Sequence, residues 1–167
     1  MTTRRAPRLG AASVGLALGA WTLAGCSGVP EGAEDAVARL EALDIVTAAP
    51  PEATLVAQAE DLGSDSGISG RNASVVAVYA SAASMDEVAD FYVASFPQYD
   101  LGEECCTTAD SMVLTGWSED TYVDVTVQRG APRYRGPSTP EPSPAPSGAE
   151  LFVAVTVAPR PDLDARD

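Results

Sequence analysis

A strict alternation over residues 122–127 constrains the fold of this chain more than any other feature of its sequence. Valine occupies positions 123, 125 and 127, and tyrosine, aspartate and threonine occupy the positions between them. Successive side chains of a β-strand point to opposite faces of the sheet, so this period of two places the valines on one face. The pattern predicts a strand of an antiparallel sheet with one buried and one hydrated face.

Four other segments also have the composition of strands: residues 53–59, 73–80, 112–117 and 151–158. Turn-forming residues fill positions 62–70, which predicts that the first two of these strands pair as a hairpin. The proline-rich residues 131–148 precede the last predicted strand. Because proline lacks an amide donor and cannot extend a helix, we expect an extended, disordered loop there.

The strongest helical signal begins at Ser84. Ser84 and Glu87 have the spacing of a capping box, in which each side chain bonds the backbone amide of the other residue. Pro97 is expected to end the helix. Residues at helical spacing between these limits form one largely apolar face: Val88, Phe91, Tyr92, Ser95 and Phe96. A shorter helix is predicted over residues 34–44, where Val37, Leu40 and Leu43 share one face.

The predicted order of elements defines an α+β fold. We expect an antiparallel sheet of about five strands, with one main helix packed on one face and the short helix before the first strand. Residues 34–167 are long enough for one domain with a hydrophobic core and too short for two.

The N-terminus has a different composition from the rest of the chain. Arg4, Arg5 and Arg8 precede an uncharged apolar stretch at residues 10–25, and the first acidic residue is Glu31. A basic start followed by a short apolar stretch and small residues is the pattern of a secretory signal peptide. The stretch is shorter than the roughly 20 residues that a membrane-spanning helix needs.

The end of this stretch carries a recognisable motif. Leu23, Ala24, Gly25 and Cys26 match the lipobox of bacterial lipoproteins at all four positions, and residues 1–26 resemble a lipoprotein signal. The resemblance implies that the Cys26 thiol receives a diacylglyceryl group carrying palmitate-type chains, and that cleavage follows Gly25. Two or three acyl chains hold a protein firmly at a membrane.

The same resemblance implies a location at the extracytoplasmic face of the cell membrane, with residues 26–33 as a lipidated tether. Both general secretion and twin-arginine export remain open as routes. The pattern of elements over residues 50–158 resembles the small α+β bodies of actinobacterial lipoproteins.

Charge and residue types exclude several classes of function. Three of the ten arginines lie in residues 1–25 and all 24 carboxylates follow them, so the mature chain carries a formal charge of −17. Phosphates are repelled by such a surface, and we expect no nucleic-acid partner. The absence of histidine and lysine excludes His-based triads, His-ligated zinc and Schiff-base chemistry. We therefore expect no enzymatic activity, no catalytic residues, no metal and no cofactor.

The adjacent Cys105 and Cys106 are a candidate disulfide. Thiols outside the cytoplasm tend to be oxidised, and Cys26 is consumed by lipid, which leaves these two to pair. A vicinal ring could serve as a redox switch or have a purely structural role. Two free thiols, or disulfides to another chain, are the alternatives.

Two further candidate sites have simpler explanations. Asp61 and Asp65 flank a glycine turn and resemble a sparse cation loop, but calcium needs six to eight oxygens and a solvated hairpin turn is favoured. The aromatic residues Tyr99, Trp117, Tyr122 and Tyr134 could form a platform for glycans or peptides, although such residues more often complete a core or cover a sheet.

The leading functional hypothesis is a membrane-anchored, non-enzymatic lipoprotein that binds another envelope component or has a structural role. A module that binds a small ligand or cation is the first alternative, and a thiol-redox protein is the second. A pocket lined by several polar groups would favour the ligand module, and a flat sheet with exposed aromatic residues would favour a protein partner.

Overall fold

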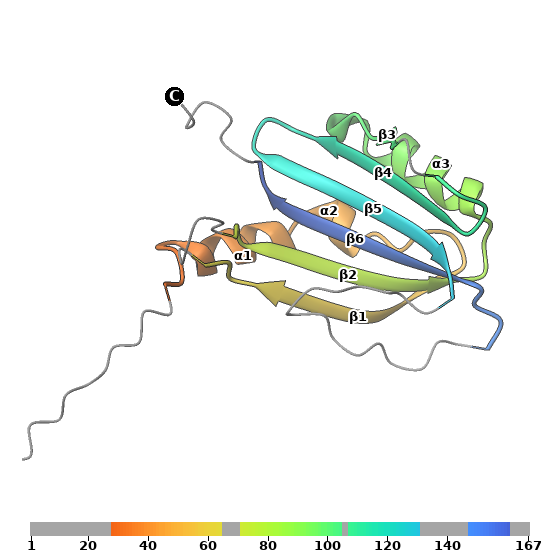
Figure 1. Cartoon of the computed structure of the whole chain (residues 1–167), viewed down its shortest axis with the longest axis horizontal. Helices are drawn as coiled ribbons and strands as arrows, with labels where there is room; N and C mark the ends of the chain where they lie inside the picture. The colour runs from red at the N-terminus through yellow and green to blue at the C-terminus, as the bar shows by residue number, and fades with distance from the viewer. Residues whose placement is uncertain (1–27, 65–70, 105–106, 131–146, 161–167) are drawn as a thin grey trace, which may run out of the picture.

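A six-stranded antiparallel sheet forms the framework of the protein, as the alternation of residues 122–127 predicts (Figure 1). The computed structural model describes residues 28–64, 71–104, 107–130 and 147–160. Its elements in chain order are α1 (Ala33–Glu41), α2 (Asp44–Thr47), β1 (Ala53–Asp61), β2 (Ser74–Ser81), α3 (Met85–Ser95), the 3-10 helix η1 (Pro97–Tyr99), β3 (Gly102–Glu103), β4 (Ser111–Trp117), β5 (Thr121–Arg129) and β6 (Leu151–Pro159).

The strand order across the sheet is β1-β2-β6-β5-β4-β3. The predicted hairpin of β1 and β2 is confirmed, and it has one irregularity between Leu55 and Ala57. After β2 the chain crosses through α3 to the far edge and returns by β3, β4 and β5, so that β6 fills the centre beside β2. The sixth strand, β3, was not predicted because two residues are too few to show a period.

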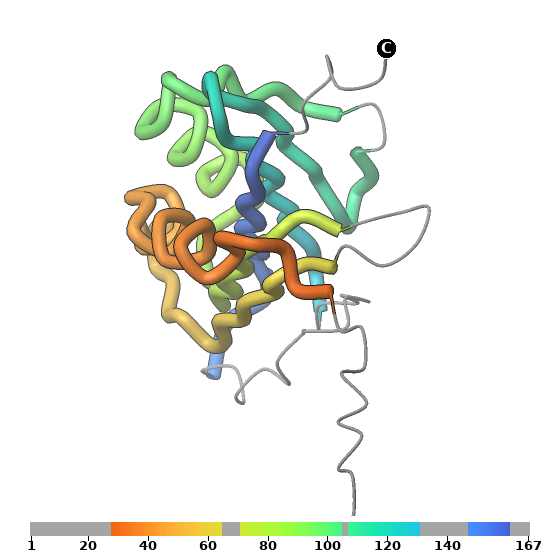
Figure 2. Tube along the Cα trace, turned by 90° about the vertical axis from the view of Figure 1, so that its left-hand side faces the viewer, coloured from red at the N-terminus to blue at the C-terminus, as the bar shows by residue number. Residues whose placement is uncertain are grey.

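All the helices in the described part of the chain lie on one face of the sheet (Figure 2). The valines of β5 point toward them and are fully buried, whereas the residues between these valines are half-buried. Other members of this core come from α1, α2, α3 and the inner faces of β2 and β6. They include Val37, Leu40, Ile45, Val46, Val75, Ala77, Tyr79, Val88, Tyr92, Leu151, Val153 and Val155.

The sequence predicted one short helix over residues 34–44, and this prediction is wrong in its limits. The first helix ends at Glu41, and Leu43 has an extended backbone that begins a second helix, α2. The hydroxyl of Tyr79 donates a hydrogen bond of 2.6 Å to the carbonyl of Val46, which ties α2 to the sheet. That contact spans 33 residues, so local periodicity could not reveal α2.

The main helix α3 follows the prediction at its start. The Ser84 side chain accepts from the Glu87 amide, and the Glu87 carboxylate accepts from the Ser84 amide at 2.9 Å. These bonds to Ser84 lower the pKa of the Glu87 carboxyl. Ser95, which the prediction placed on the apolar face, is exposed. Met85 and Ala89, which the prediction did not include, are buried. The helix ends at Ser95, before Pro97 as predicted, and Pro97 then begins η1.

The second face of the sheet is divided into two halves. Over β2 and β6 it is apolar, and Val76, Val78 and Ala154 form a second buried cluster there. Over β5 and β4 it carries half-buried or exposed residues such as Tyr122 and Trp117. No helix among the described residues has the length and apolarity needed to cross a membrane.

Candidate functional site

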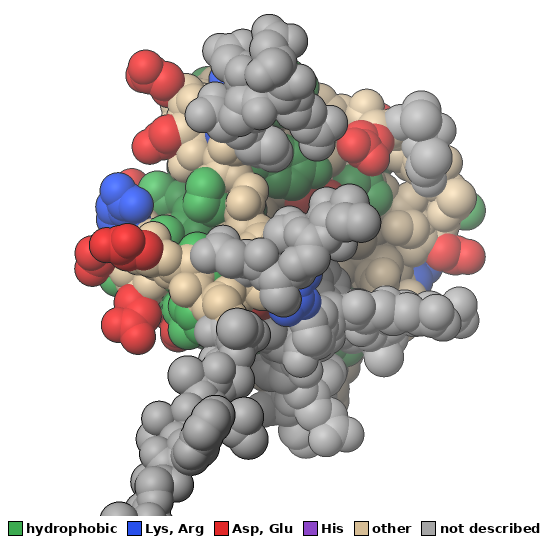
Figure 3. Space-filling model, turned by 60° about the vertical axis from the view of Figure 1, so that its left-hand side comes forward, with side chains coloured by type: hydrophobic (Ala, Val, Ile, Leu, Met, Phe, Trp, Pro, Cys, Tyr) green, Lys and Arg blue, Asp and Glu red, His purple; other side chains and the backbone are tan. Residues whose placement is uncertain are grey.

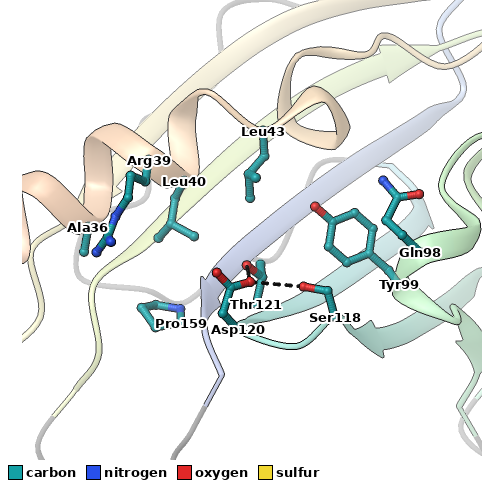
Figure 4. A pocket seen from close by; sticks show the side chains of 10 residues that line it. All are labelled: Ala36, Arg39, Leu40, Leu43, Gln98, Tyr99, Ser118, Asp120, Thr121 and Pro159. Atoms are coloured by element: carbon teal, nitrogen blue, oxygen red, sulfur yellow. Dashed lines mark hydrogen bonds between the residues drawn. The ribbon is translucent and has the colours of Figure 1, made fainter.

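A cleft of about 350 Å³ opens at one end of the sheet, on the helical face, between α1 and η1 (Figure 4). The turn between β4 and β5 forms its floor together with the end of β6. This volume is at the lower limit of pockets that bind small molecules. Its lining residues are Ala36, Arg39, Leu40, Leu43, Gln98, Tyr99, Ser118, Asp120, Thr121 and Pro159.

The α1 side of the cleft supplies an apolar wall and one cation. Leu40 is buried against the sheet, and Leu43 is half-buried at the junction with α2. Arg39 lies in the last turn of α1, where a positive charge interacts favourably with the helix dipole, and Glu34 and Asp35 lie in the first turn. Local sequence therefore favours this helix and carries the guanidinium to the cleft.

The floor of the cleft is a tight turn that holds Asp120. The Ser118 amide bonds the Thr121 carbonyl at 2.8 Å, and the Arg160 amide bonds the Asp120 carbonyl at 2.8 Å. Two hydroxyls, those of Ser118 and Thr121, donate to the Oδ1 atom of Asp120 at 3.3 and 3.0 Å. These bonds fix the carboxylate and leave Oδ2 without a donor among the described residues.

The opposite wall is formed by η1, which lies close to β4 because β4 carries a glycine at this point. A Cβ atom on Gly116 would collide with the carbonyl oxygen of Tyr99 and would lie 3.1 Å from the carbonyl oxygen of Asp100. The glycine therefore permits a backbone approach that no other residue would allow. This approach places Tyr99 in the wall, with only 5% of the residue exposed.

Negative charge surrounds the Tyr99 end of the cleft. Burial raises the pKa of the Tyr99 hydroxyl, and the nearby carboxylates of Asp120 and Asp44 raise it further. The hydroxyl therefore stays protonated at neutral pH. Figure 4 shows it directed into the cleft, with Arg39 at the other end and Asp120 between them.

The charged groups of the cleft are not paired with each other. The ion pairs that the described residues form with one another are Arg71 with Asp61 and Arg129 with Glu150, and neither includes Arg39 or Asp120. The cleft is thus lined by a guanidinium, a carboxylate and a phenol beside apolar side chains. Ser118 donates to Asp120, but a serine without a histidine lacks the general base that normally activates it. The arrangement is suited to binding.

The predicted cation loop is only partly within the described residues. Asp61 accepts from the Gly63 amide at 2.8 Å and pairs with Arg71 at 3.3 Å, so it closes the turn that follows β1. Asp65 lies outside the described residues. In the described part of the chain, no group of three or more His, Cys, Asp or Glu residues is positioned to hold a metal ion.

The other predicted site residues also lie outside the described residues: Leu23, Ala24, Gly25, Cys26, Cys105 and Cys106, together with residues 131–146 of the proline-rich segment. The predictions made for them remain predictions.

The proposed aromatic platform does not assemble as one surface. Trp117 and Tyr122 are partners across β4 and β5, on the face opposite the helices. Tyr99 belongs instead to the core on the helical side, and Tyr134 lies outside the described residues. Trp117 is 54% exposed, and the Arg160 guanidinium lies 5.8 Å from its ring centroid.

The sequence interpretation missed the cleft. It named Tyr99 only as an aromatic residue, and it did not single out Arg39, Gln98 or Asp120. Comparison of the chain with family models, with curated proteins and with solved structures gave no match. The site is therefore interpreted from its own geometry.

Proposed function

We propose that this chain is an extracytoplasmic lipoprotein, anchored through Cys26, whose folded body is a non-enzymatic module that binds a small molecule in the cleft between α1 and η1. The observation that carries the binding function is that Arg39 and Asp120, which form no ion pair with another described residue, lie beside apolar side chains in that cleft. Both side chains are exposed, and each retains hydrogen-bonding capacity that a ligand could use.

The anchor is supported by the four lipobox residues and by the short distance along the chain between Cys26 and the folded body. Only six residues separate Cys26 from the start of α1 at Ala33. At roughly 3.5 Å per extended residue, this tether keeps the body within about 25 Å of the membrane surface. Acidic side chains are spread over the face that Figure 3 shows, and an anionic membrane would repel such a surface. The lipid chains therefore have to supply the attachment.

The anchor is tested by the mass of the N-terminal peptide of the purified native protein. We expect a peptide that begins at Cys26 and carries a diacylglyceryl thioether, and we expect a Cys26→Ser variant to lose membrane association. An N-terminus at Met1, or an unmodified thiol at Cys26, would overturn this part of the proposal.

The binding function is tested by a thermal-shift screen of small polar and amphiphilic compounds against the native protein. A compound that binds only the folded state raises the melting temperature. We expect hits whose effect is lost in the double variant Arg39→Gln, Asp120→Asn and retained in the control Arg129→Gln, Asp90→Asn, whose sites lie outside the cleft. If no hit depends on the cleft residues, this function is wrong.

A second candidate function is recognition of an envelope protein through the outer face of β4 and β5. The specific observation is Trp117, a large and exposed aromatic residue that is stacked with Arg160. Aromatic residues and arginine are enriched at protein interfaces. Crosslinking of the anchored protein, with Trp117→Ser as the comparison, distinguishes this candidate from the cleft.

A further inference from the structure

We infer that the ligand of the cleft is a small zwitterion with an apolar side chain, of the size of an α-amino acid or a short peptide. This inference rests on the proposed function and specifies its ligand. Its basis is the distribution of polar groups along the cleft, which has the Arg39 guanidinium at one end, the Tyr99 phenol at the other and the Asp120 carboxylate between them (Figure 4).

The ammonium group of such a ligand would bind at Asp120. The Oδ1 atom of Asp120 already accepts from the Ser118 and Thr121 hydroxyls. The Oδ2 atom accepts no hydrogen bond from another described residue, and Asp44 adds negative charge near Tyr99. A cation with several donors would bind the Asp120 carboxylate more strongly than a neutral group, because hydrogen bonds that involve charged groups are about twice as strong as neutral ones.

The carboxylate group would bind at Arg39. The guanidinium is planar and offers two parallel N–H donors, a geometry that matches a carboxylate. Arg39 forms no ion pair with another described residue. The Tyr99 hydroxyl is protonated and provides one more donor in the wall.

The apolar part of the ligand would contact the aliphatic wall of the cleft. Leu40, Leu43 and Pro159 line the cleft, and none of their side chains can satisfy a polar atom. The size of the cleft, about 350 Å³, accommodates an amino acid or a dipeptide.

The test is calorimetric titration of the native protein with four probes: L-leucine, the dipeptide leucyl-leucine, leucinamide and N-acetylleucine. Leucinamide lacks the carboxylate, and N-acetylleucine lacks the ammonium group. We expect the better of the two zwitterions to bind at least about ten-fold more tightly than either blocked compound, since one lost charged hydrogen bond costs about that factor.

Substitutions of Asp120 and Arg39 test which residue binds the ammonium group of the ligand and which binds its carboxylate. Asp120→Asn keeps an oxygen that can accept from the two hydroxyls. It should weaken binding of the zwitterion about ten-fold and leave binding of N-acetylleucine unchanged. Arg39→Gln should weaken the zwitterion similarly and leave leucinamide unchanged. Asp90→Asn and Arg129→Gln, which alter matched charges away from the cleft, should change nothing.

The outcomes separate this inference from the function on which it rests. If blocked and zwitterionic probes bind equally, or if none of the four binds while the screen finds other cleft ligands, the inference is overturned and the binding function stands. If neither the probes nor the screen yields a ligand that depends on the cleft, both are wrong. The comparison of probes on the unaltered protein decides the matter even if a variant fails to fold.

Discussion

The close approach of η1 to β4 makes Gly116→Ala the most informative single substitution. The new Cβ would collide with the Tyr99 carbonyl oxygen and would lie 3.1 Å from both the Asp100 carbonyl oxygen and the Leu101 Cα atom. All three contacts are to backbone, so no side chain can rotate away. The two segments must separate by roughly 1 Å, or the overpacking must be accommodated as strain of about 1–3 kcal/mol.

The cost of separation can be estimated from Tyr99, which is 5% exposed. A buried aromatic residue removes roughly 200 Å² from water, and re-exposing half of that area costs about 2.5 kcal/mol at about 25 cal/mol/Å². Strain and re-exposure thus lead to a similar estimate. We expect Gly116→Ala to lower the free energy of unfolding by about 2–3 kcal/mol, and to weaken binding in the cleft because Tyr99 forms its wall.

Urea unfolding followed by far-UV circular dichroism measures this effect. At an m-value of roughly 2 kcal/mol/M, the midpoint should fall by about 1 M with m unchanged. Gly102→Ala is the matched control, because a Cβ on Gly102, in the neighbouring strand β3, meets nothing within 4 Å. It should change stability by less than about 0.5 kcal/mol. Equal stability of the two variants would refute the close packing of η1 on β4 and the geometry of the cleft wall.

Three further predictions concern the fold. Tyr79→Phe should lower the free energy of unfolding, measured in urea, by about 1–2 kcal/mol, because it leaves the buried Val46 carbonyl without its donor. A change below about 0.3 kcal/mol would contradict the tie between α2 and the sheet. Ser84→Ala should lower the free energy of unfolding by about 1 kcal/mol, because the helix loses its cap. It should also remove the lowering of the Glu87 pKa, which titration by NMR can follow. An unchanged Glu87 pKa would argue against the capping box. Burial raises the pKa of the Asp124 carboxyl, so ionisation of this group opposes folding. Ionisation has no effect on stability below the unfolded-state pKa of about 3.9, where the carboxyl is protonated in both states. The destabilisation grows as pH rises from there through the folded-state pKa. Asp124→Asn should therefore be more stable than the unaltered protein at pH 7 and should lose this advantage near pH 3, whereas a gain that is the same at both pH values would exclude this explanation.

Local sequence determined the α+β class, the hairpin of β1 and β2, the strands at the centre of the sheet and the start of α3. The valines of β5 alternate with polar residues within a single strand, and the Ser84–Glu87 box closes within one helical turn. Both signals act over a few residues, so a sequence pattern records them. The lipobox is equally local, and its consequences for location are predicted from those four residues and the basic and apolar residues before them.

Tertiary structure alone decided the position of β6 between β2 and β5, the existence of α2 and β3, and the cleft. Arg39, Tyr99 and Asp120 come from segments up to 81 residues apart, and none has a neighbour in sequence that marks it as part of a site. What brings them together is a glycine in β4 that admits η1, a turn whose backbone is tied to Arg160, and a helix end placed by the packing of Leu40. These contacts depend on which elements become neighbours after folding, and no periodicity along the chain encodes that.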